Sequence, residues 1–383
     1  MWMDTKTEVG EAGRSHASVS QRVLNGLLLC TGDMMHLDDY MQGKLFVLQL
    51  AVWGLRGVTR VILANNPLSG ALILAALYWA SPWQALLGTL GVLTSTLTAI
   101  MIGQYSAEVS GGHHGFNGML LSLLMGAYSS AGDWYCWLLL PVCVGSATCV
   151  FLYSGLSSVF DRWDLPVAVF PFNIIIVLYL LCTGPDNPYF PHHRVSPPGT
   201  LEPNGTKIVL VEVTHGILLG VGQIFACEAP GPSLLILGAV LLYSPLLGVH
   251  ALLGSAAGTL AGLSMAVRHD CLYSGLSGFN GALGCMAVGG LCFTFSWRTH
   301  LLAVANAFLS AYVDIALGNL LGSVGLPACS WAATLTVTLM LLLTGSLAAY
   351  RIPTGQVMAP EHNLRCRSQW EAGNSTGRES TDA

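Results

Sequence analysis

The stretch Gly115-Phe116-Asn117-Gly118 decides the fold, because the same four residues return 163 positions later as Gly278-Phe279-Asn280-Gly281. Four further anchors keep the same order and nearly the same offset: Pro67 and Pro230, Ser81-Pro82 and Ser244-Pro245 (offset 163), Leu165-Pro166 and Leu326-Pro327, Thr183-Gly184 and Thr344-Gly345 (offset 161). Five ordered anchors indicate two copies of one unit. The change of offset indicates a two-residue deletion in the second copy.

The composition is that of a polytopic membrane protein. Of the 383 residues, 53% are hydrophobic and only 9% are charged, against about 25% charged in an ordinary soluble domain. Glycine and tryptophan are frequent, with 44 and 10 residues, as expected in membrane helices and at their interfaces. The net charge of −5 excludes a strongly basic nucleic-acid binder. The 11 cysteines are scattered without any CxxC spacing, so we interpret them as small membrane hydrophobes and expect no metal site.

Polar segments divide the chain into five parts. We expect a tail at 1–43, a first transmembrane repeat at 44–184, a linker at 185–207, a second repeat at 208–350 and a tail at 351–383. Basic residues in both tails predict that both termini are cytoplasmic. The proline-rich linker carries a glycosylation sequon at Asn204, which favours an extracellular position.

This topology predicts an inverted repeat. If both termini lie inside and the linker outside, each half crosses the membrane an odd number of times, and folds of this kind place the substrate path at the repeat interface. Several apolar runs, such as Ala71 to Ala80 and Phe116 to Tyr128, are shorter than the roughly 20 residues of a span. They indicate tilted or re-entrant elements.

Longer stretches carry a resemblance to a known family. They are Arg56 to Gly70, Leu165 to Asn173, Val221 to Phe225 and Gly325 to Trp331, beside the two GFNG motifs. Through them the chain resembles the urea transporter family, specifically the vertebrate facilitative urea channels. The resemblance implies an all-α fold with about five transmembrane helices plus one re-entrant half-helix in each half. It further implies a homotrimer in the plasma membrane, a pore in each protomer, passive conduction of urea, and no cofactor.

The family pattern is only partly kept at the filter. It has LPxxTxPF in each half, with the two threonines flanking the middle of the pore, and a glutamine on each half-membrane helix. In this chain Val169 and Ser330 stand at the threonine positions. Gln223 is present in the second half, whereas Arg60 stands at the equivalent first-half position. Three of these four filter positions have therefore changed.

The chemistry of urea explains what these positions require. Urea is planar, uncharged and rich in N–H donors, and removing it from water without compensation costs several kcal/mol, on the order of an unpaired amide. Gln223 and Ser330 can accept its hydrogen bonds, but Val169 cannot. We therefore expect a urea pore. The alternative is a pore with altered selectivity, for water, ammonia or urea analogues.

Arg60 is the largest departure and has two interpretations. An arginine inside a membrane costs roughly 2.5–3.5 kcal/mol unless it is hydrated or paired. It either reaches a headgroup or pairs with Glu228 or Glu108, or it lines a pore mouth, donates to the urea oxygen and repels cations. An arginine offers only donors.

Four weaker candidates complete the predicted substrate path. His113 precedes the first GFNG motif and is a candidate pore-lining or pH-sensing residue. Adjacent histidines point in different directions, so His113 and His114 do not predict a metal site. Glu228 is a candidate acceptor at a mouth. Phe116 and Phe279 either form flat apolar walls or serve as packing residues.

Other classes of protein are less well supported. The chain has no G-x-S-x-G, HExxH, P-loop or dinucleotide motif in the required context, so we expect no enzyme. An ion-coupled transporter would use intramembrane carboxylates, and only Asp314 and Glu212 are candidates. Small residues at four-residue spacing predict close helix packing: Gly254, Gly258 and Gly262, matched by Gly91, Ser95 and Ala99.

Overall fold

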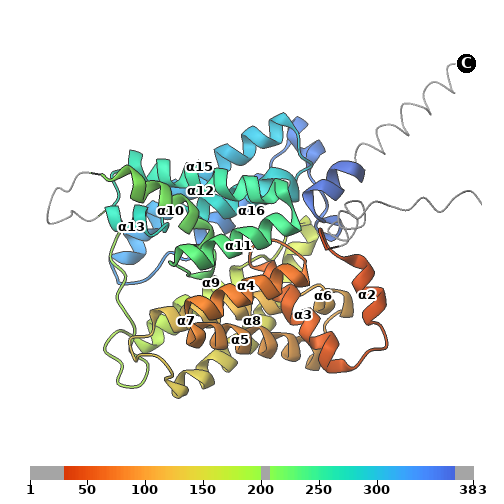
Figure 1. The fold of residues 1–383 in the computed structure, drawn as a ribbon, viewed down its shortest axis with the longest axis horizontal. Helices are drawn as coiled ribbons and strands as arrows, with labels where there is room; N and C mark the ends of the chain where they lie inside the picture. The colour runs from red at the N-terminus through yellow and green to blue at the C-terminus, as the bar shows by residue number, and fades with distance from the viewer. Residues whose placement is uncertain (1–29, 200–207, 367–383) are drawn as a thin grey trace, which may run out of the picture.

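The computed structural model describes residues 30–199 and 208–366, which form helices joined by short loops (Figure 1). The sequon at Asn204 and most of both tails lie outside the described residues. The first half contains α2 (Met35–Met41), α3 (Phe46–Arg60), α4 (Pro67–Ala80), α5 (Pro82–Met101), α6 (Ser106–Ser110), α7 (Gly115–Tyr128), α8 (Leu139–Phe160) and α9 (Phe170–Thr183). The second half contains α10 (Leu210–Gly222), α11 (Pro230–Tyr243), α12 (Pro245–Ser264), α13 (His269–Tyr273), α14 (Phe279–Met286), α15 (Trp297–Gly322) and α16 (Trp331–Leu341).

The two halves repeat the same element order. Helices α4 and α11, α5 and α12, and α6 and α13 begin and end at positions related by the offset of the GFNG motifs. Residues with positive φ recur at the same offsets as the anchors, as in Leu63 (62°) and Ala226 (53°), or Ala168 (49°) and Cys329 (48°). Such conformations are uncommon outside glycine, so their recurrence means that corresponding segments have the same local backbone.

The Ser-Pro anchors are helix starts. Ser81 and Ser244 have extended backbones, and their hydroxyls accept from the N–H groups of Gln84 (3.3 Å) and Leu247 (3.0 Å). The proline that follows fits the first helical position, where no N–H is needed. The residue before a proline avoids the helical region. Each Ser-Pro pair therefore ends one helix and begins the next.

Only some of the helices are long enough to cross a membrane. Among the described residues, four helical segments are long and apolar enough: Pro82–Met101, Cys136–Trp163, Pro245–Ser264 and Trp297–Gly322. A fifth candidate is the bent pair Leu210–Phe225 and Pro230–Tyr243, which turns by 73°. Helices α4, α9, α14 and α16 are shorter apolar elements. The structure therefore has the apolar helices of a membrane protein, in agreement with the composition.

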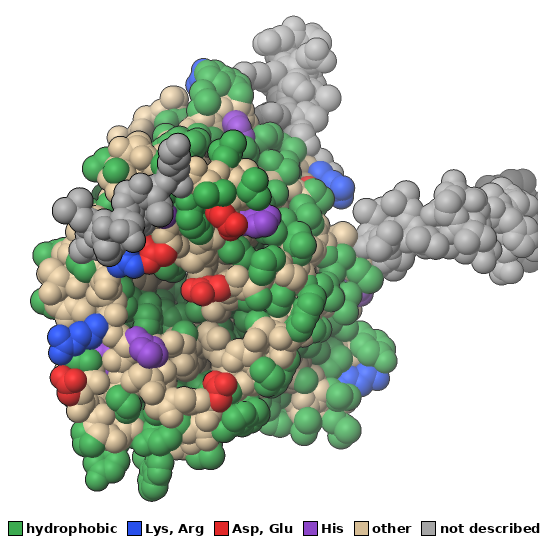
Figure 2. All heavy atoms as spheres, turned by 60° about the vertical axis from the view of Figure 1, so that its left-hand side comes forward, with side chains coloured by type: hydrophobic (Ala, Val, Ile, Leu, Met, Phe, Trp, Pro, Cys, Tyr) green, Lys and Arg blue, Asp and Glu red, His purple; other side chains and the backbone are tan. Residues whose placement is uncertain are grey.

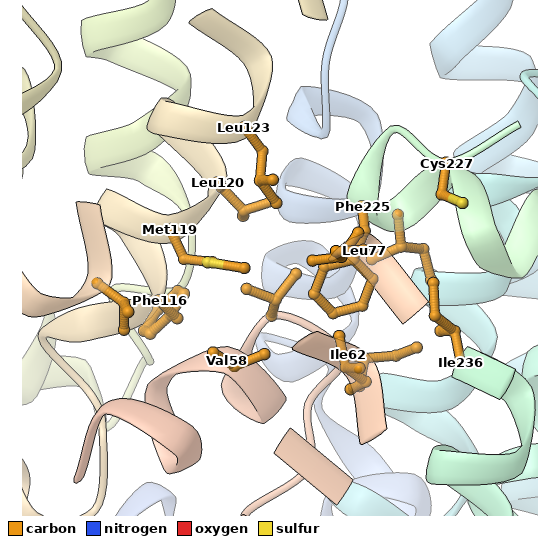
Figure 3. Close-up of a cluster of buried hydrophobic side chains, with 14 of the residues drawn as sticks. Val58, Ile62, Leu77, Phe116, Met119, Leu120, Leu123, Phe225, Cys227 and Ile236 are labelled. Carbon is orange, nitrogen blue, oxygen red and sulfur yellow. The ribbon is translucent and has the colours of Figure 1, made fainter. Parts of the chain in front are cut away.

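The two halves share one hydrophobic core. Helices α4 and α11 lie side by side at its centre (Figure 1), and the Ser69 hydroxyl donates to the Ala239 carbonyl across this contact (2.8 Å). Figure 3 shows Ile62 and Leu77 from the first half meeting Phe225 and Ile236 from the second. A core built from both copies fixes how the halves sit together.

Glycines bring two helix pairs into backbone contact. A Cβ on Gly118 of α7 would lie 2.6 Å from the Gly91 carbonyl oxygen of α5, and one on Gly91 would lie 2.3 Å from the Gly118 carbonyl oxygen. In the second half, Gly281 and Gly254 approach each other in the same way, at 2.4 and 2.3 Å. These contacts confirm the close helix packing predicted from the four-residue spacing.

The beginning and the end of the described chain lie on one side of the molecule, opposite residues 185–199 (Figure 1). Asp33 accepts from the Tyr243 hydroxyl (3.1 Å) and from the Ala359 N–H (2.9 Å). Residues 351–363, called here the C-terminal segment, are held by Asp164, which accepts from the N–H (3.0 Å) and hydroxyl (2.7 Å) of Thr354. Arg351 Nη2 lies 3.1 Å from an Asp164 carboxylate oxygen.

Candidate pore

One continuous cavity of about 630 Å³ takes its wall from both halves. Five linker residues line one end, and three residues of the C-terminal segment line the other: His193, Arg194, Val195, Ser196 and Pro198, and Ile352, Thr354 and Val357. Most of the lining between them is aliphatic or aromatic. Figure 2 shows the linker side, where a hollow with a hydrophobic floor is bordered by acidic and histidine side chains. A cavity with mostly apolar walls suits an uncharged solute.

All eight residues predicted for the substrate path lie on this cavity. They are Arg60, His113, Phe116, Val169, Gln223, Glu228, Phe279 and Ser330. They come from segments far apart in both halves of the sequence, so the fold has gathered them. Phe116 and Phe279 hold repeat-equivalent places on the wall, as do Val169 and Ser330.

The GFNG asparagines hold the LP motifs in place. Asn117 Nδ2 donates to the Ala168 carbonyl (3.2 Å), and its Oδ1 accepts from the Phe172 N–H (3.1 Å). In the second half, Asn280 Nδ2 donates to the Cys329 carbonyl (2.9 Å) and its Oδ1 accepts from the Ala333 N–H (3.1 Å). Each asparagine therefore fixes the turn before α9 or α16. The sequence identified both motifs as anchors but did not predict this role, because the bonded partners lie beyond the next helix along the chain.

The two filter turns present different side chains. Val169 and Ser330 have nearly the same backbone, with φ and ψ of −99° and 19° against −97° and 20°. The Ser330 hydroxyl donates to Asn173 Oδ1 (3.3 Å), which leaves its oxygen lone pairs able to accept. Val169 offers no polar atom. At these two equivalent positions the cavity wall is therefore apolar in the first half and polar in the second.

Gln223 and Arg60 are anchored by equivalent bonds. Gln223 Nε2 donates to the Ser274 carbonyl (2.9 Å), and Arg60 Nε donates to the Gly111 carbonyl (2.9 Å); the two carbonyls are themselves repeat equivalents. Gln223 Nε2 also lies 3.3 Å from Glu228 Oε1. Among the described residues no donor reaches Gln223 Oε1, so this carbonyl oxygen is available on the cavity wall. At the equivalent place Arg60 offers donors only.

The expected pairing of Arg60 with a glutamate does not occur among the described residues. Glu108 lies instead 3.3 Å from His114 Nε2, and Glu228 lies beside Gln223. Arg60 is partly exposed to the cavity, and its terminal nitrogens have no carboxylate partner in the part of the chain that is described. Arg60 therefore lies on the cavity wall without a glutamate partner, and its contact with a solute stays a prediction.

The adjacent histidines point in different directions. His113 lies on the cavity with Nδ1 3.3 Å from the Glu108 carbonyl, whereas the buried His114 packs edge-on against Tyr153, with ring centroids 4.8 Å apart. Within residues 30–199 and 208–366, no three histidine, cysteine or acidic side chains are placed to hold a metal ion.

Comparison with known proteins gives the family. A sequence model described as urea transporter matches residues 51–345. Curated relatives named urea transporter 1 include those of Rattus norvegicus, 42% identical over 336 residues (87% of each chain), and of Ovis aries, 40% identical over 346 residues (90% of each chain). The chain belongs to the urea transporter family. Urea transporters are membrane transport proteins and not enzymes, as the absence of catalytic motifs had predicted.

Two residues on the path of this urea transporter were not predicted for it. Asp314 of α15 lies on the cavity wall, where its Oδ1 accepts from Asn280 Nδ2 (2.9 Å). From the sequence, Asp314 was a candidate only for ion coupling. A single acidic residue in an apolar run does not show toward which surface its side chain points. Glu212, the other such candidate, is exposed and lies 4.0 Å from His215. Tyr153, the repeat equivalent of Asp314, also lines the cavity.

Proposed function

We propose that this protein conducts urea passively across the plasma membrane, down its gradient, through the cavity of each protomer. The observation that carries the proposal is one largely apolar cavity whose wall carries two neutral side-chain acceptors, Gln223 Oε1 and the Ser330 hydroxyl. Each accepted N–H offsets part of the several kcal/mol needed to remove an amide from water. Gln223 and Ser330 accept these hydrogen bonds without adding a negative charge to the wall.

We further propose that the two halves are related by inverted topology. The side-chain amide of Asn173 lies 3.4 Å from the Thr334 hydroxyl, and these two residues are repeat equivalents. Equivalent residues on the two halves touch where a pseudo-twofold axis passes between them. Such an axis in the membrane plane makes the two pore mouths equivalent in backbone and puts the linker and both tails on opposite sides.

The remaining expectations follow from the family and from this topology. Five spanning helices and one re-entrant half-helix in each half, a homotrimer, cytoplasmic termini and an extracellular linker glycosylated at Asn204 are parts of the same proposal. Loss of a glycan-dependent mass shift in Asn204→Gln would support the linker's position. A detergent-purified particle with the mass of three chains would support the trimer.

The alternative is altered selectivity, and Arg60 and Val169 favour it. Restoring an acceptor with Arg60→Gln adds one hydrogen bond for a second NH2 group, worth about 0.5–1.5 kcal/mol, or roughly two- to tenfold in rate or affinity. We expect the ratio of urea flux to acetamide flux to rise in this variant, because acetamide has only one NH2 group. The matched control is Arg298→Gln, since Arg298 is exposed beside Trp297.

Urea flux measured in proteoliposomes tests both the passive urea pore and the altered selectivity. Urea efflux that stops when the gradient is dissipated, and that is independent of sodium and proton gradients, supports the passive pore. Uphill urea accumulation driven by either ion contradicts it. If Arg60→Gln and Arg298→Gln leave the urea-to-acetamide ratio equal to that of the wild type, Arg60 takes no part in selection. If water or ammonia crosses the membrane and urea does not, urea is not the permeant.

A further inference from the structure

Two side chains of opposite charge, Arg60 and Asp314, lie toward different ends of the cavity wall. Arg60 lies on the side where the described chain begins, because the neighbouring Thr59 hydroxyl accepts from the Asn66 N–H, and Asn66 Nδ2 donates to the carbonyls of Cys30 and Gly32. Asp314 lies toward the linker side. It is one helical turn before Gly318 of α15, which contacts Pro198. A solute that enters from the linker side therefore meets Asp314, together with the linker's Arg194, which pairs with Asp186 (3.4 Å), before it meets Arg60.

Asp314 has fewer partners than a carboxylate can take. A carboxylate accepts about four hydrogen bonds, and the described residues supply one, from Asn280 Nδ2 to Oδ1. Asn280 is itself fixed by the Cys329 carbonyl and the Ala333 N–H, so the position of the carboxylate is well defined. Within the described part of the chain no arginine, lysine or histidine pairs with Asp314. Its remaining acceptor capacity is directed to whatever occupies the cavity.

The shape of the cavity and this carboxylate together select a class of ligand. Guanidinium is planar and of the same size as urea, but it carries a positive charge and N–H donors in place of the carbonyl oxygen. Two parallel N–H groups match the two oxygens of a carboxylate, the geometry that makes such pairs strong. Flat apolar walls at Phe279 and Leu283 accommodate the faces of the ion.

We propose that Asp314 binds guanidinium-type cations that enter from the linker side, and that Arg60 prevents them from passing. The inference rests on the proposed urea pathway, because it places the cation on the same route. Arg60 repels a like charge, and no acidic side chain of the described residues forms an ion pair with it. Guanidinium is therefore a sided blocker of urea flux rather than a second permeant.

Urea flux measured with guanidinium on one side tests the block. In proteoliposomes of defined orientation, millimolar guanidinium on the linker side should inhibit the wild type, with a half-inhibitory concentration that rises with urea concentration. Asp314→Asn retains the acceptor for Asn280 but loses the charge, and it should raise the half-inhibitory concentration at least tenfold. The control Asp133→Asn should not, because Asp133 is exposed, does not line the cavity, and lies near the linker, where the Ser130 N–H donates to the Pro191 carbonyl. Equal inhibition of the wild type and Asp314→Asn, or equal inhibition from both sides, overturns the proposal.

Two further measurements separate binding from urea conduction. Saturation-transfer NMR with methylguanidinium on the purified protein should give a signal that is lost in Asp314→Asn, whether or not the protein conducts urea. Absence of that signal in the wild type contradicts the site, whereas absence of urea flux contradicts only the proposed function. Labelled guanidinium uptake should be at background in the wild type and measurable in Arg60→Gln. Wild-type uptake at the rate of urea would show that Arg60 is no barrier.

Discussion

The close contact between α5 and α7 gives a sharp prediction for Gly118→Ala. The new Cβ would lie 2.6 Å from the Gly91 carbonyl oxygen and 2.0 Å from Ser95 Oγ, whereas carbon–oxygen contacts ordinarily begin at about 3.3 Å. Gly91 O is a backbone atom inside a helix, so the two helices must separate by about 0.7 Å at this level to reach that contact distance. The Ser95 hydroxyl must also leave the Ser146 carbonyl, to which it donates at 2.8 Å.

The expected change in stability is the balance of two destabilising contributions and one stabilising contribution. Overpacking costs typically about 1–3 kcal/mol, and loss of the buried hydrogen bond adds about 1 kcal/mol. The higher helix propensity of alanine returns about 1 kcal/mol. The expected result for Gly118→Ala is a net loss of about 2 kcal/mol of stability. Because α7 carries Phe116 on the cavity wall, urea flux per molecule should fall as well.

Thermal unfolding of the purified protein in detergent measures the loss. Gly155→Ala is the matched control, because Gly155 lies in helix α8 with no atom within 4 Å of the place that a new Cβ would take, and it should equal or exceed the wild type in stability. Gly281→Ala, at the equivalent contact with Gly254, should lose a similar amount. If Gly118→Ala and Gly155→Ala have the same melting temperature, the backbone contact does not contribute to stability and the reasoning is wrong.

Two further changes test the connections around the pore. Asn66→Ala removes the cap of α4, where Asn66 Oδ1 accepts from two N–H groups and Nδ2 donates to two carbonyls. The free energy of unfolding, measured by denaturation, should fall by about 1–2 kcal/mol. A variant as stable as the wild type would contradict this role of the cap. Partial burial acts to raise the pKa of Asp164, but hydrogen bonds from Thr354 and the charge of Arg351 outweigh it, so the pKa lies below its ordinary value. The stabilisation is therefore present at neutral pH and is lost as the pH falls through the folded-state pKa. The stability difference between wild type and Asp164→Asn should shrink at acidic pH; a pH-independent difference would refute the assignment.

The sequence could predict what depends on local pattern. The repeat anchors predicted two copies of one unit, and helices α4 and α11, α5 and α12, and α6 and α13 begin and end at the same offset. The eight path residues followed from the repeat and from the family resemblance. The roles of Asn117 and Asn280 could not be predicted, since a motif does not name partners that lie beyond the next helix. Arg60 had two interpretations because the Gly111 carbonyl that orients it is brought there by tertiary packing.

The C-terminal segment shows most clearly what the sequence alone could not predict. Its composition resembles that of an ordinary polar tail, yet Ile352, Thr354 and Val357 line the cavity. The contact depends on Asp164, which lies far earlier in the chain, in the first half. Only a fold that brings the LP turn of the first half next to the end of the second half makes these residues neighbours.

This placement has a consequence for biosynthesis. The cavity wall begins with Arg60 and takes its last residue from Val357, so a nascent chain has already inserted both apolar repeats before the wall is complete. A half-made protein in the membrane therefore lacks one side of its own conduit. The order of translation thus makes completion of the path one of the last events in the maturation of the described chain.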